Sequence, residues 1–380
     1  MSNSFFNQYV ILSRIGKGSF GQILRCEEIS TNKKKAVKVA YNSVFNQKQL
    51  INEIFIYKQI QGSVGIPNIY WYGNERNATI MVMDLLGTSL ETLFSQQKNF
   101  FTIKTVLLLA DQMISRIEYL HKKGIVHRDI KPENFVFGNT TEDSKTLYLI
   151  DYGLSQRYIN QNTGEHIKYQ ENCSPSGTIR YLSINTHKGI IQSRRDDMES
   201  LGYVLIYFLT GKLPWQGAPG DTNSTRSQNV LNIKLETSIE DLCNGLPKEF
   251  LIYMKNIRSL QFDEEPYYSS YKSLFRDLLI KMNYYYDDIY DWTPSSPKAS
   301  QQIHIPVNLS KIKSNQNQNQ NPNTIQNSEI AYKDQRYSKP NIVQQYKTIF
   351  RSRNCLPAVR STKSSIAQFK TIIAKPIIKS

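Results

Sequence analysis

The sequence predicts an α+β fold made of a small β-rich part, about residues 9–86, and a larger helical part, about 87–293, followed by a tail. Strand-like segments alternate with turn residues through the first part, and apolar residues recur at spacings of three and four through the second. The composition changes abruptly after Thr293. We therefore expect one domain over 9–293 and a low-complexity segment over 294–380.

The composition is typical of a soluble protein from a reducing compartment. Hydrophobic residues make up 39% of the 380 residues, and there is no run of eighteen apolar residues and no start resembling a signal peptide. We therefore expect no transmembrane segment. Four cysteines are scattered without metal-ligand spacing, which favours reduced thiols in a cytoplasmic and/or nuclear setting over zinc.

A glycine-rich segment joins the first two predicted strands, residues 9–15 and 22–27. Gly16, Gly18 and Gly21 match G-x-G-x-x-G, and glycines in such a turn let backbone N–H groups approach a triphosphate. The segment lies between two strands and not before a helix, which disfavours a dinucleotide site, although glycines also occur in hairpins without a ligand. The residues predicted to cover a nucleotide are Ile15, Gly16, Lys17, Gly18, Ser19, Phe20, Gly21, Gln22 and Ile23.

Lys38 lies in the next predicted strand, residues 35–40. Its surroundings resemble the Val-Ala-Ile-Lys signature, whose lysine contacts the α- and β-phosphates of a nucleotide. Taken alone, such a lysine would be a solvated surface residue. A helix expected near residues 48–60 supplies Glu53 as its candidate partner, and the alternative for Glu53 is a solvent-facing side chain.

An apolar strand over residues 78–86 ends just before Gly87. In protein kinases, which the glycine-rich segment and the Lys38 strand resemble, such a strand leads into a hinge between the two lobes. The resemblance implies that backbone groups of Asp84 and Leu86 bond the adenine edge and that Met83 lines the pocket behind it. The alternative for Met83 is a plain core position, which is usual for methionine in an apolar strand.

The clearest helix is expected over residues 103–122, where apolar residues form a broad stripe and Gly124 follows as a C-cap. This helix would support the loop that comes next. That loop contains His-Arg-Asp, with Asn134 five residues after Asp129, and Asp151 follows within an Asp-Tyr-Gly run.

These two runs resemble the catalytic loop and the magnesium-binding loop of protein kinases, with Tyr152 in place of the usual Phe. The resemblance implies phosphoryl transfer from ATP, with Asp129 handling the hydroxyl proton and Lys131 contacting the γ-phosphate. Asn134 and Asp151 would hold Mg²⁺, because hard cations take oxygen ligands. The alternative, an Asp that caps a helix and an Asn in a turn, suits either residue alone but not the full spacing.

Several longer runs are similar to the casein kinase I family of serine/threonine kinases. Ser183-Ile184-Asn185 stands where most kinases have Ala-Pro-Glu, and the resemblance extends over about residues 9–293. The runs that carry it are 65–67, 81–87, 107–119, 183–187, 192–204 and 213–217. The family resemblance implies a two-lobed kinase fold that is active without activation-loop phosphorylation. The rival interpretation, a catalytically silent pseudokinase scaffold, is disfavoured because all the polar catalytic residues are present.

The same resemblance implies substrates with acidic or phosphorylated residues upstream of the acceptor. Arg180 and Arg226 fall where the family has anion-binding basic residues, and arginine suits this role because its planar guanidinium binds oxygens bidentately. The alternative for each is an exposed surface arginine, especially for Arg226, whose surroundings depart from the family. Gln156 and Cys173 replace lysines of the family, so a second anion site should be weaker.

A buried helix is expected over residues 196–208. By resemblance to kinases, an Asp at its start would brace the backbone of the catalytic loop. We also expect structural ion pairs there, joining Arg194 and Arg195 to Asp196, Asp197 and Glu199.

The tail accounts for most of the net charge of +15. Residues 294–380 hold 14 Lys and Arg but 2 Asp and Glu, a net of +12, together with alternating Asn and Gln. This composition predicts disorder. Basic charge with interspersed aromatic residues fits contact with nucleic acid or an anionic membrane, but a solvated linker with docking or autophosphorylation sites is the more frequent case.

Overall fold

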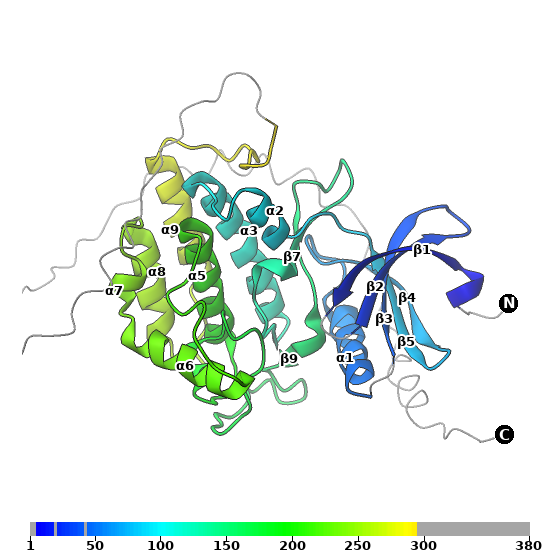
Figure 1. The fold of residues 1–380 in the computed structure, drawn as a ribbon, viewed down its shortest axis with the longest axis horizontal. Helices are drawn as coiled ribbons and strands as arrows, with labels where there is room; N and C mark the ends of the chain where they lie inside the picture. The colour runs from blue at the N-terminus through cyan, green and yellow to red at the C-terminus, as the bar shows by residue number, and fades with distance from the viewer. Residues whose placement is uncertain (1–4, 19–20, 42–43, 295–380) are drawn as a thin grey trace, which may run out of the picture. The chain divides into compact units, whose positions relative to one another are not determined.

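The computed structural model describes residues 5–18, 21–41 and 44–294. Within these ranges an antiparallel sheet with one helix beside it is followed by a mainly helical part (Figure 1), which confirms the predicted α+β class. Ser19, Phe20 and the predicted tail beyond Pro294 lie outside the described residues.

The sheet has the strand order β1-β2-β3-β5-β4, with every neighbouring pair antiparallel. β3 and β5 lie inside the sheet and are largely buried, which explains their nearly continuous apolar runs. The edge strand β4 was not predicted, because Gly73 and Asn74 interrupt a segment that is only partly buried. The strands are β1 (Tyr9–Gly18), β2 (Gly21–Glu28), β3 (Lys34–Ala40), β4 (Ile69–Glu75) and β5 (Ala78–Asp84).

Helix α1 (Val44–Ile60) packs against this sheet and begins before the predicted residue 48. Its buried positions include Leu50, Ile54 and Tyr57, and also the charged Glu53. A buried carboxylate needs a partner, because leaving a charge unpaired away from water is costly. The helix therefore holds Glu53 toward the interior and not toward solvent.

The helical part is built around α3 and α5, both mostly buried. α3 spans Ile103–Lys122, as predicted, with Thr102 as its N-cap and Gly124 at φ +74 just beyond its end. The helices are α2 (Leu90–Gln96), α3 (Ile103–Lys122), α4 (Ile184–His187), α5 (Arg194–Thr210), α6 (Asn223–Glu236), α7 (Ile239–Leu242), α8 (Lys248–Ser259) and α9 (Tyr268–Lys281). In the described ranges, no helix combines the length and the apolar character needed to span a bilayer.

Two short ladders lie between α3 and the start of α4. β6 (Ile125–Val126) pairs with β9 (Gln156–Arg157), and β7 (Phe135–Phe137) pairs with β8 (Leu147–Leu149). The 3₁₀ turns η2 (Pro132–Asn134) and η3 (Tyr152–Leu154) follow β6 and β8. These ladders carry the loops in which the sequence predicts chemistry.

Lys234 of α6 is fully buried and reaches α4. Its ammonium lies 3.3 Å from His187 Nε2, and the rings of Tyr203 and Trp215 lie 4.6 and 4.7 Å away. His187 Nδ1 lies 3.0 Å from Ser227 Oγ. Burial, followed by the charge of Lys234, lowers the pKa of His187 from 6.5 to about 3. His187 is therefore neutral in the folded protein at neutral pH.

We expect acid to destabilise the domain through His187. The unfolded chain binds this proton near pH 6.5 and the folded chain only near pH 3, so the contribution is complete above pH 6.5 and is lost as the pH falls below it. At pH 5.5 one such histidine costs about 1.4 kcal/mol. Denaturant unfolding gives the free energy of unfolding at pH 7.5 and at pH 5.5. The decrease between these two pH values should be smaller in His187→Gln than in the unmodified protein, by about 1.4 kcal/mol. Equal losses in both proteins would contradict this account.

Candidate active site

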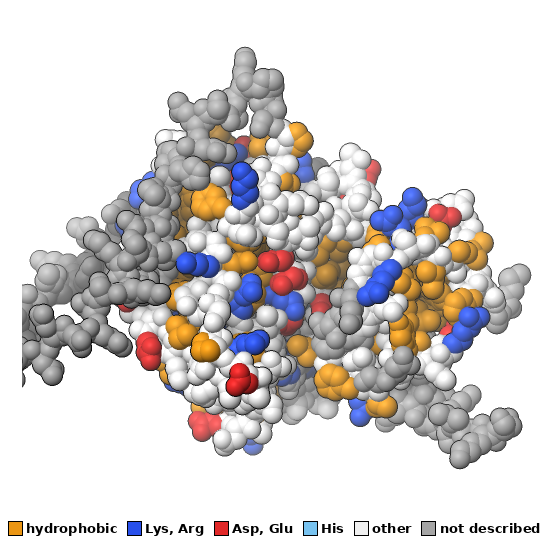
Figure 2. Space-filling view, viewed as in Figure 1, with side chains coloured by type: hydrophobic (Ala, Val, Ile, Leu, Met, Phe, Trp, Pro, Cys, Tyr) orange, Lys and Arg blue, Asp and Glu red, His pale blue; other side chains and the backbone are white. Residues whose placement is uncertain are grey.

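Charged side chains of both signs gather near the middle of the face shown in Figure 2, where the sheet meets the helical part. Lys38 of β3 is buried, with its ammonium 2.6 Å from Glu53 Oε2 and 2.8 Å from Asp151 Oδ1. The pairing of Lys38 with Glu53 is the one expected from the sequence, and Asp151 is an additional partner. Burial alone would lower the pKa of Lys38, but the two carboxylates outweigh it and the pKa is raised.

The β7–β8 ladder brings Asn134 and Asp151 together. Asn134 immediately precedes β7 and Asp151 follows β8 by two residues, and Phe135 is paired with Leu149. The backbone N–H of Ile150 also donates to the Asn134 carbonyl at 2.9 Å. In an antiparallel pair the start of one strand lies beside the end of the other, so these two predicted metal ligands are neighbours.

Asp151 has left-handed backbone angles, φ +66 and ψ +67. A non-glycine residue in this region costs about 1 kcal/mol or more, so surrounding contacts must hold it there. Lys38 supplies one such contact, at Oδ1, which leaves Oδ2 for another ligand. Burial alone would raise the pKa of Asp151, but the Lys38 ammonium holds it below its usual value, so the carboxylate is ionised at neutral pH.

The Asn134 amide is oriented by the catalytic loop. Its Nδ2 donates to the backbone carbonyl of Asp129 at 2.8 Å and lies 3.4 Å from Asp129 Oδ2. Since the NH₂ end faces these acceptors, Oδ1 is the end available to a cation. The side chain is therefore arranged as an oxygen donor.

Both oxygens of Asp129 are held by neighbouring groups. Oδ1 accepts from the N–H of Thr178 at 2.8 Å and from its hydroxyl at 2.7 Å, and Oδ2 accepts from Lys131 Nζ at 2.6 Å. Lys131 also donates to the Thr178 hydroxyl at 3.2 Å. Thr178 was not predicted as a site residue, because no pattern near Asp129 indicates a partner 49 positions away.

Asp197 of α5 braces the backbone of the catalytic loop. Its carboxylate accepts from the N–H groups of His127 at 2.7 Å and Arg128 at 2.8 Å, and it lies 2.9 Å from His121 Nε2. An Asp in this role was expected, and the structure identifies which one. Asp196 instead binds the backbone N–H of its own helix cap, Ser193, at 2.8 Å.

The ion pairs predicted at the start of α5 are wrong among the described residues. Arg194 donates to the Asp263 carbonyl, and Arg195 donates to the Leu260 carbonyl at 3.0 Å. Glu199 pairs with Arg258 of α8 at 3.6 Å. The i,i+3 and i,i+4 spacings within this group permit ion pairs, but more distant segments hold both arginines and the carboxylates of Asp197 and Glu199.

Arg128 and Tyr152 both find partners inside the fold. Arg128 Nε and Nη1 donate to Gln192 Oε1 at 2.8 Å and to Gln156 Oε1 at 2.7 Å. The Tyr152 hydroxyl donates to the Leu149 carbonyl at 2.9 Å. The hydroxyl that distinguishes Asp-Tyr-Gly from Asp-Phe-Gly is therefore accommodated.

The predicted hinge residues lie at the end of β5 and just beyond it. Leu86 lies beyond β5, where the N–H of the following Gly87 donates to the Phe137 carbonyl at 2.8 Å. Met83 is half-buried against the main core. The N–H of Asp84 donates to the Asn68 carbonyl at 3.1 Å, just before β4, so this N–H is already used within the protein.

The glycine-rich segment is a tight hairpin in which Gly16 pairs with Ile23 and Gly18 with Gly21. A Cβ on Gly21 would lie 2.1 Å from the Val39 carbonyl oxygen, so close packing on β3 requires this glycine. At Gly16 a Cβ would meet nothing closer than 3.9 Å. Packing within the protein therefore does not require the glycine at 16. Ile15 and Gln22 lie in the two strands, whereas the side chain of Lys17 lies outside the described residues.

The structure shows no contact that joins the two predicted anion-binding arginines in its described part. Arg180 is half-buried, with its guanidinium 5.6 Å from each of the rings of Tyr181 and Tyr207, and its carbonyl accepts from Trp215 Nε1 at 2.7 Å. Arg226 is exposed on α6. A shared pocket for these two residues remains a prediction.

Asn52 of α1 is a site residue that sequence reasoning missed. Its amide donates to the carbonyls of Gly153 at 3.1 Å and Ser155 at 3.0 Å, in the segment that follows Asp151. The neighbouring Glu53 binds Lys38, so adjacent residues of α1 hold both the lysine and the segment that follows Asp151. No local pattern indicates these contacts, since an Asn before a Glu in a helix is unremarkable.

A family model for the protein kinase domain matches residues 9–282. The match covers most of the chain, including the glycine-rich hairpin, the Lys38–Glu53 pair and the loops of Asp129 and Asp151. This chain therefore belongs to the protein kinase family.

Proposed function

We propose that this chain is an active serine/threonine protein kinase that transfers the γ-phosphate of ATP to protein hydroxyls with the help of Mg²⁺. The observation that carries the proposal is the meeting of three oxygen-bearing side chains and one lysine from the loops of the two short ladders with a second lysine from β3. These residues are Asp129, Asn134, Asp151, Lys38 and Lys131. Together these side chains can accept the proton of a hydroxyl group, bind a cation and contact phosphate oxygens.

The donor set fits Mg²⁺. Asn134 presents Oδ1 and Asp151 presents Oδ2, both oxygen donors on adjacent strand ends. Mg²⁺ is usually held by one or two protein ligands and completes its shell with phosphate oxygens and water. Bound here, it would offset the negative charge of the phosphates. Lys38, held by Glu53 and Asp151, would position the α- and β-phosphates.

Asp129 is the residue placed to receive the substrate hydroxyl. Thr178 and Lys131 fix the direction of its carboxylate before any substrate binds. Lys131 can turn from Asp129 to the γ-phosphate and reduce the charge on the transferring group. Positioning and electrostatics of this kind supply most of the catalysis in phosphoryl transfer.

We expect Asn52→Ala to lower kcat about five- to thirtyfold, with little change in the KM for protein substrate. The substitution removes two hydrogen bonds worth about 1 kcal/mol each, which hold the segment after Asp151 against α1. Initial-rate kinetics of the purified full-length protein check this. Lys48→Ala, an exposed position on the same helix, is the matched control. A kcat equal to that of the control would show that Asn52 does not position the site.

We further propose a substrate preference of the casein kinase I type, for Ser or Thr preceded by acidic or phosphorylated residues. The similarity of runs 183–187 and 213–217 to that family supports it, together with the location of Arg180 beside Trp215. The half-buried guanidinium of Arg180 has no carboxylate within ion-pair distance among the described residues, so its charge can serve a substrate phosphate.

Priming should raise kcat/KM by at least about tenfold, as expected for one charge-assisted contact. The measurement compares a peptide carrying phosphoserine three residues upstream of its acceptor serine with the same peptide unphosphorylated. Arg180→Ala should remove most of the difference, whereas Lys281→Ala, an exposed change on α9, should keep it. Equal rates on both peptides would count against the anion pocket. No turnover of any substrate would instead favour a silent scaffold.

We place the protein in the cytoplasm and/or nucleus, where reduced cysteines are the rule. The cysteines of the described part, Cys26, Cys173 and Cys243, are free thiols. Contact of the tail with nucleic acid or an anionic membrane also remains a proposal. Gel shifts and vesicle sedimentation of the full chain, compared with residues 1–293, would test it.

A further inference from the structure

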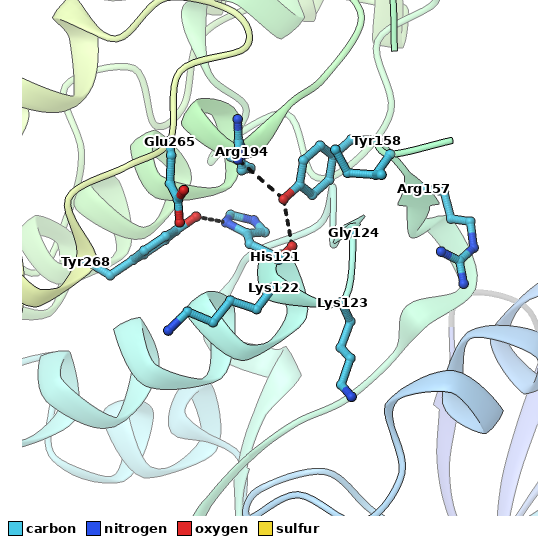
Figure 3. A pocket seen from close by; sticks show the side chains of 10 residues that line it. His121, Lys122, Lys123, Gly124, Arg157, Tyr158, Arg194, Glu265 and Tyr268 are labelled. Atoms are coloured by element: carbon cyan, nitrogen blue, oxygen red, sulfur yellow. Dashed lines mark hydrogen bonds between the residues drawn. The ribbon is translucent and has the colours of Figure 1, made fainter. Parts of the chain in front are cut away.

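A pocket of about 310 Å³ lies where the end of α3, strand β9, the start of α5 and the start of α9 meet (Figure 3). It contains none of the side chains proposed above to bind ATP, Mg²⁺ or substrate. Its lining residues are His121, Lys122, Lys123, Gly124, Arg157, Tyr158, Ile159, Arg194, Glu265 and Tyr268.

The lining carries four cations and one carboxylate. Figure 3 shows Lys122, Lys123, Arg157 and Arg194 on different sides of the central His121. Among the described residues only Lys122 of these four forms an ion pair, at 2.6 Å from Glu118. The other three cations outnumber the single carboxylate in the lining, that of Glu265.

In the described ranges, the two arginines of the pocket donate to neutral acceptors and to no carboxylate. Arg194 donates to the Asp263 carbonyl and to the Tyr158 hydroxyl, the latter at 3.5 Å. The guanidinium of Arg157 faces the side-chain amide of Gln161. Burial lowers the pKa of Arg157, and no carboxylate opposes that effect. Positive charge in this pocket is thus left for an anion to compensate.

Hydrogen bonds hold the walls of the pocket in place. The Tyr158 hydroxyl donates to the His121 carbonyl at 2.6 Å, and its N–H donates to the Gly124 carbonyl at 2.9 Å. His121 Nδ1 lies 2.7 Å from the Tyr268 hydroxyl, and Figure 3 shows this link. Nε2 of the same histidine lies 2.9 Å from Asp197, which holds the catalytic loop. A preformed pocket needs little ordering when a ligand binds.

We propose that this pocket binds a phosphomonoester dianion, presented either by a phosphorylated protein segment or as free phosphate. Guanidinium and ammonium groups are the side chains best suited to phosphate oxygens. The volume exceeds that of one phosphate group and leaves room for the atoms that carry it. Glu265 in the lining would repel a long acidic stretch or an anionic membrane surface, so a single compact dianion fits better.

The test uses the full-length protein and a fluorescent peptide with one phosphoserine among neutral residues, followed by anisotropy. Lys123→Glu should raise the Kd by at least about tenfold, because it reverses one charge beside a dianion. Lys123 is exposed, and among the residues that the structure describes its ammonium contacts the Tyr119 ring, at 5.4 Å, and no carboxylate, so the fold should be unaffected, and an unchanged Tm would verify this. Lys281→Glu, the matched charge reversal on α9, should leave the Kd unchanged.

The Arg180→Ala variant separates this pocket from the substrate site. The phosphopeptide should still bind to the Arg180→Ala variant and also to Asp129→Asn, because binding in the pocket requires no turnover. Failure of the proposed function would therefore not abolish this binding. An equal Kd in the Lys123→Glu and Lys281→Glu proteins, or loss of binding in Arg180→Ala alone, would overturn the proposal. Competition with inorganic phosphate identifies the source. Equal affinities for inorganic phosphate and for the phosphopeptide indicate that free phosphate is the ligand. Tighter binding of the phosphopeptide indicates a phosphorylated protein segment.

Discussion

Asp129→Asn is expected to lower kcat by about 10²- to 10⁴-fold, the usual contribution of a positioned proton acceptor. The amide keeps the shape of the carboxylate. Its oxygen can still accept a hydrogen bond from the Thr178 N–H, which lies 2.8 Å from Oδ1 in the unmodified protein. It cannot take up the hydroxyl proton, and its NH₂ would face the Lys131 ammonium in place of the oxygen that lies 2.6 Å away. The loss should therefore fall on the chemical step.

The measurement is transfer of labelled phosphate from ATP to casein at saturating concentrations of both substrates. Thermal unfolding of the same preparation should give a Tm close to that of the unmodified protein. Asp277→Asn, at an exposed position of α9, is the control for the chemical change. A variant with full activity would exclude Asp129 from proton handling.

Asp151→Asn should reduce kcat/KM for ATP by about 10²- to 10³-fold, because removing one group that stabilises transition-state charge typically costs that much. Asn is the informative replacement, since after Gly it is among the residues that best tolerate the left-handed angles found at this position. Its oxygen can also keep the hydrogen bond from Lys38. What the variant loses is the negative charge facing the cation.

A magnesium titration distinguishes a ligand from a structural residue. If Asp151 binds the metal, raising Mg²⁺ from 1 to 20 mM should recover part of the activity of Asp151→Asn and should change the control Asp277→Asn little. A deficit that is independent of Mg²⁺, accompanied by a lower Tm, would assign Asp151 a structural role instead.

The site could be predicted from sequence wherever the relevant groups lie in one short run. His127 through Asn134 and the Asp151 run are of this kind, because a loop of fixed length sets the spacing of its own side chains. The bounds of α3 were predicted for the same reason, since its stripe and its terminal glycine are local signals. Glu53 was found because few acidic residues compete for Lys38 in the helix that follows it.

Contacts over long separations could not be predicted in this way. Thr178 reaches Asp129 across 49 positions and Asn52 reaches Ser155 across 103, and neither carries a local pattern. The ion pairs expected at the start of α5 failed for the converse reason. The spacing permits them, but distant segments supply other partners: Arg194 and Arg195 bind backbone carbonyls of residues 263 and 260, and Asp197 is held by the catalytic loop.

By itself, the sequence determined the α+β class, the catalytic and metal-binding loops and the family resemblance. Each of these depends on the spacing of residues that are close together in the chain, and this spacing can be read from the sequence. Only the tertiary structure decided which Asp of α5 braces the loop, that Lys38 bridges Glu53 and Asp151, and that Arg157 and Arg194 line one pocket. The physical reason is that packing of the core selects one arrangement of distant segments, and this arrangement alone places their side chains within hydrogen-bonding distance.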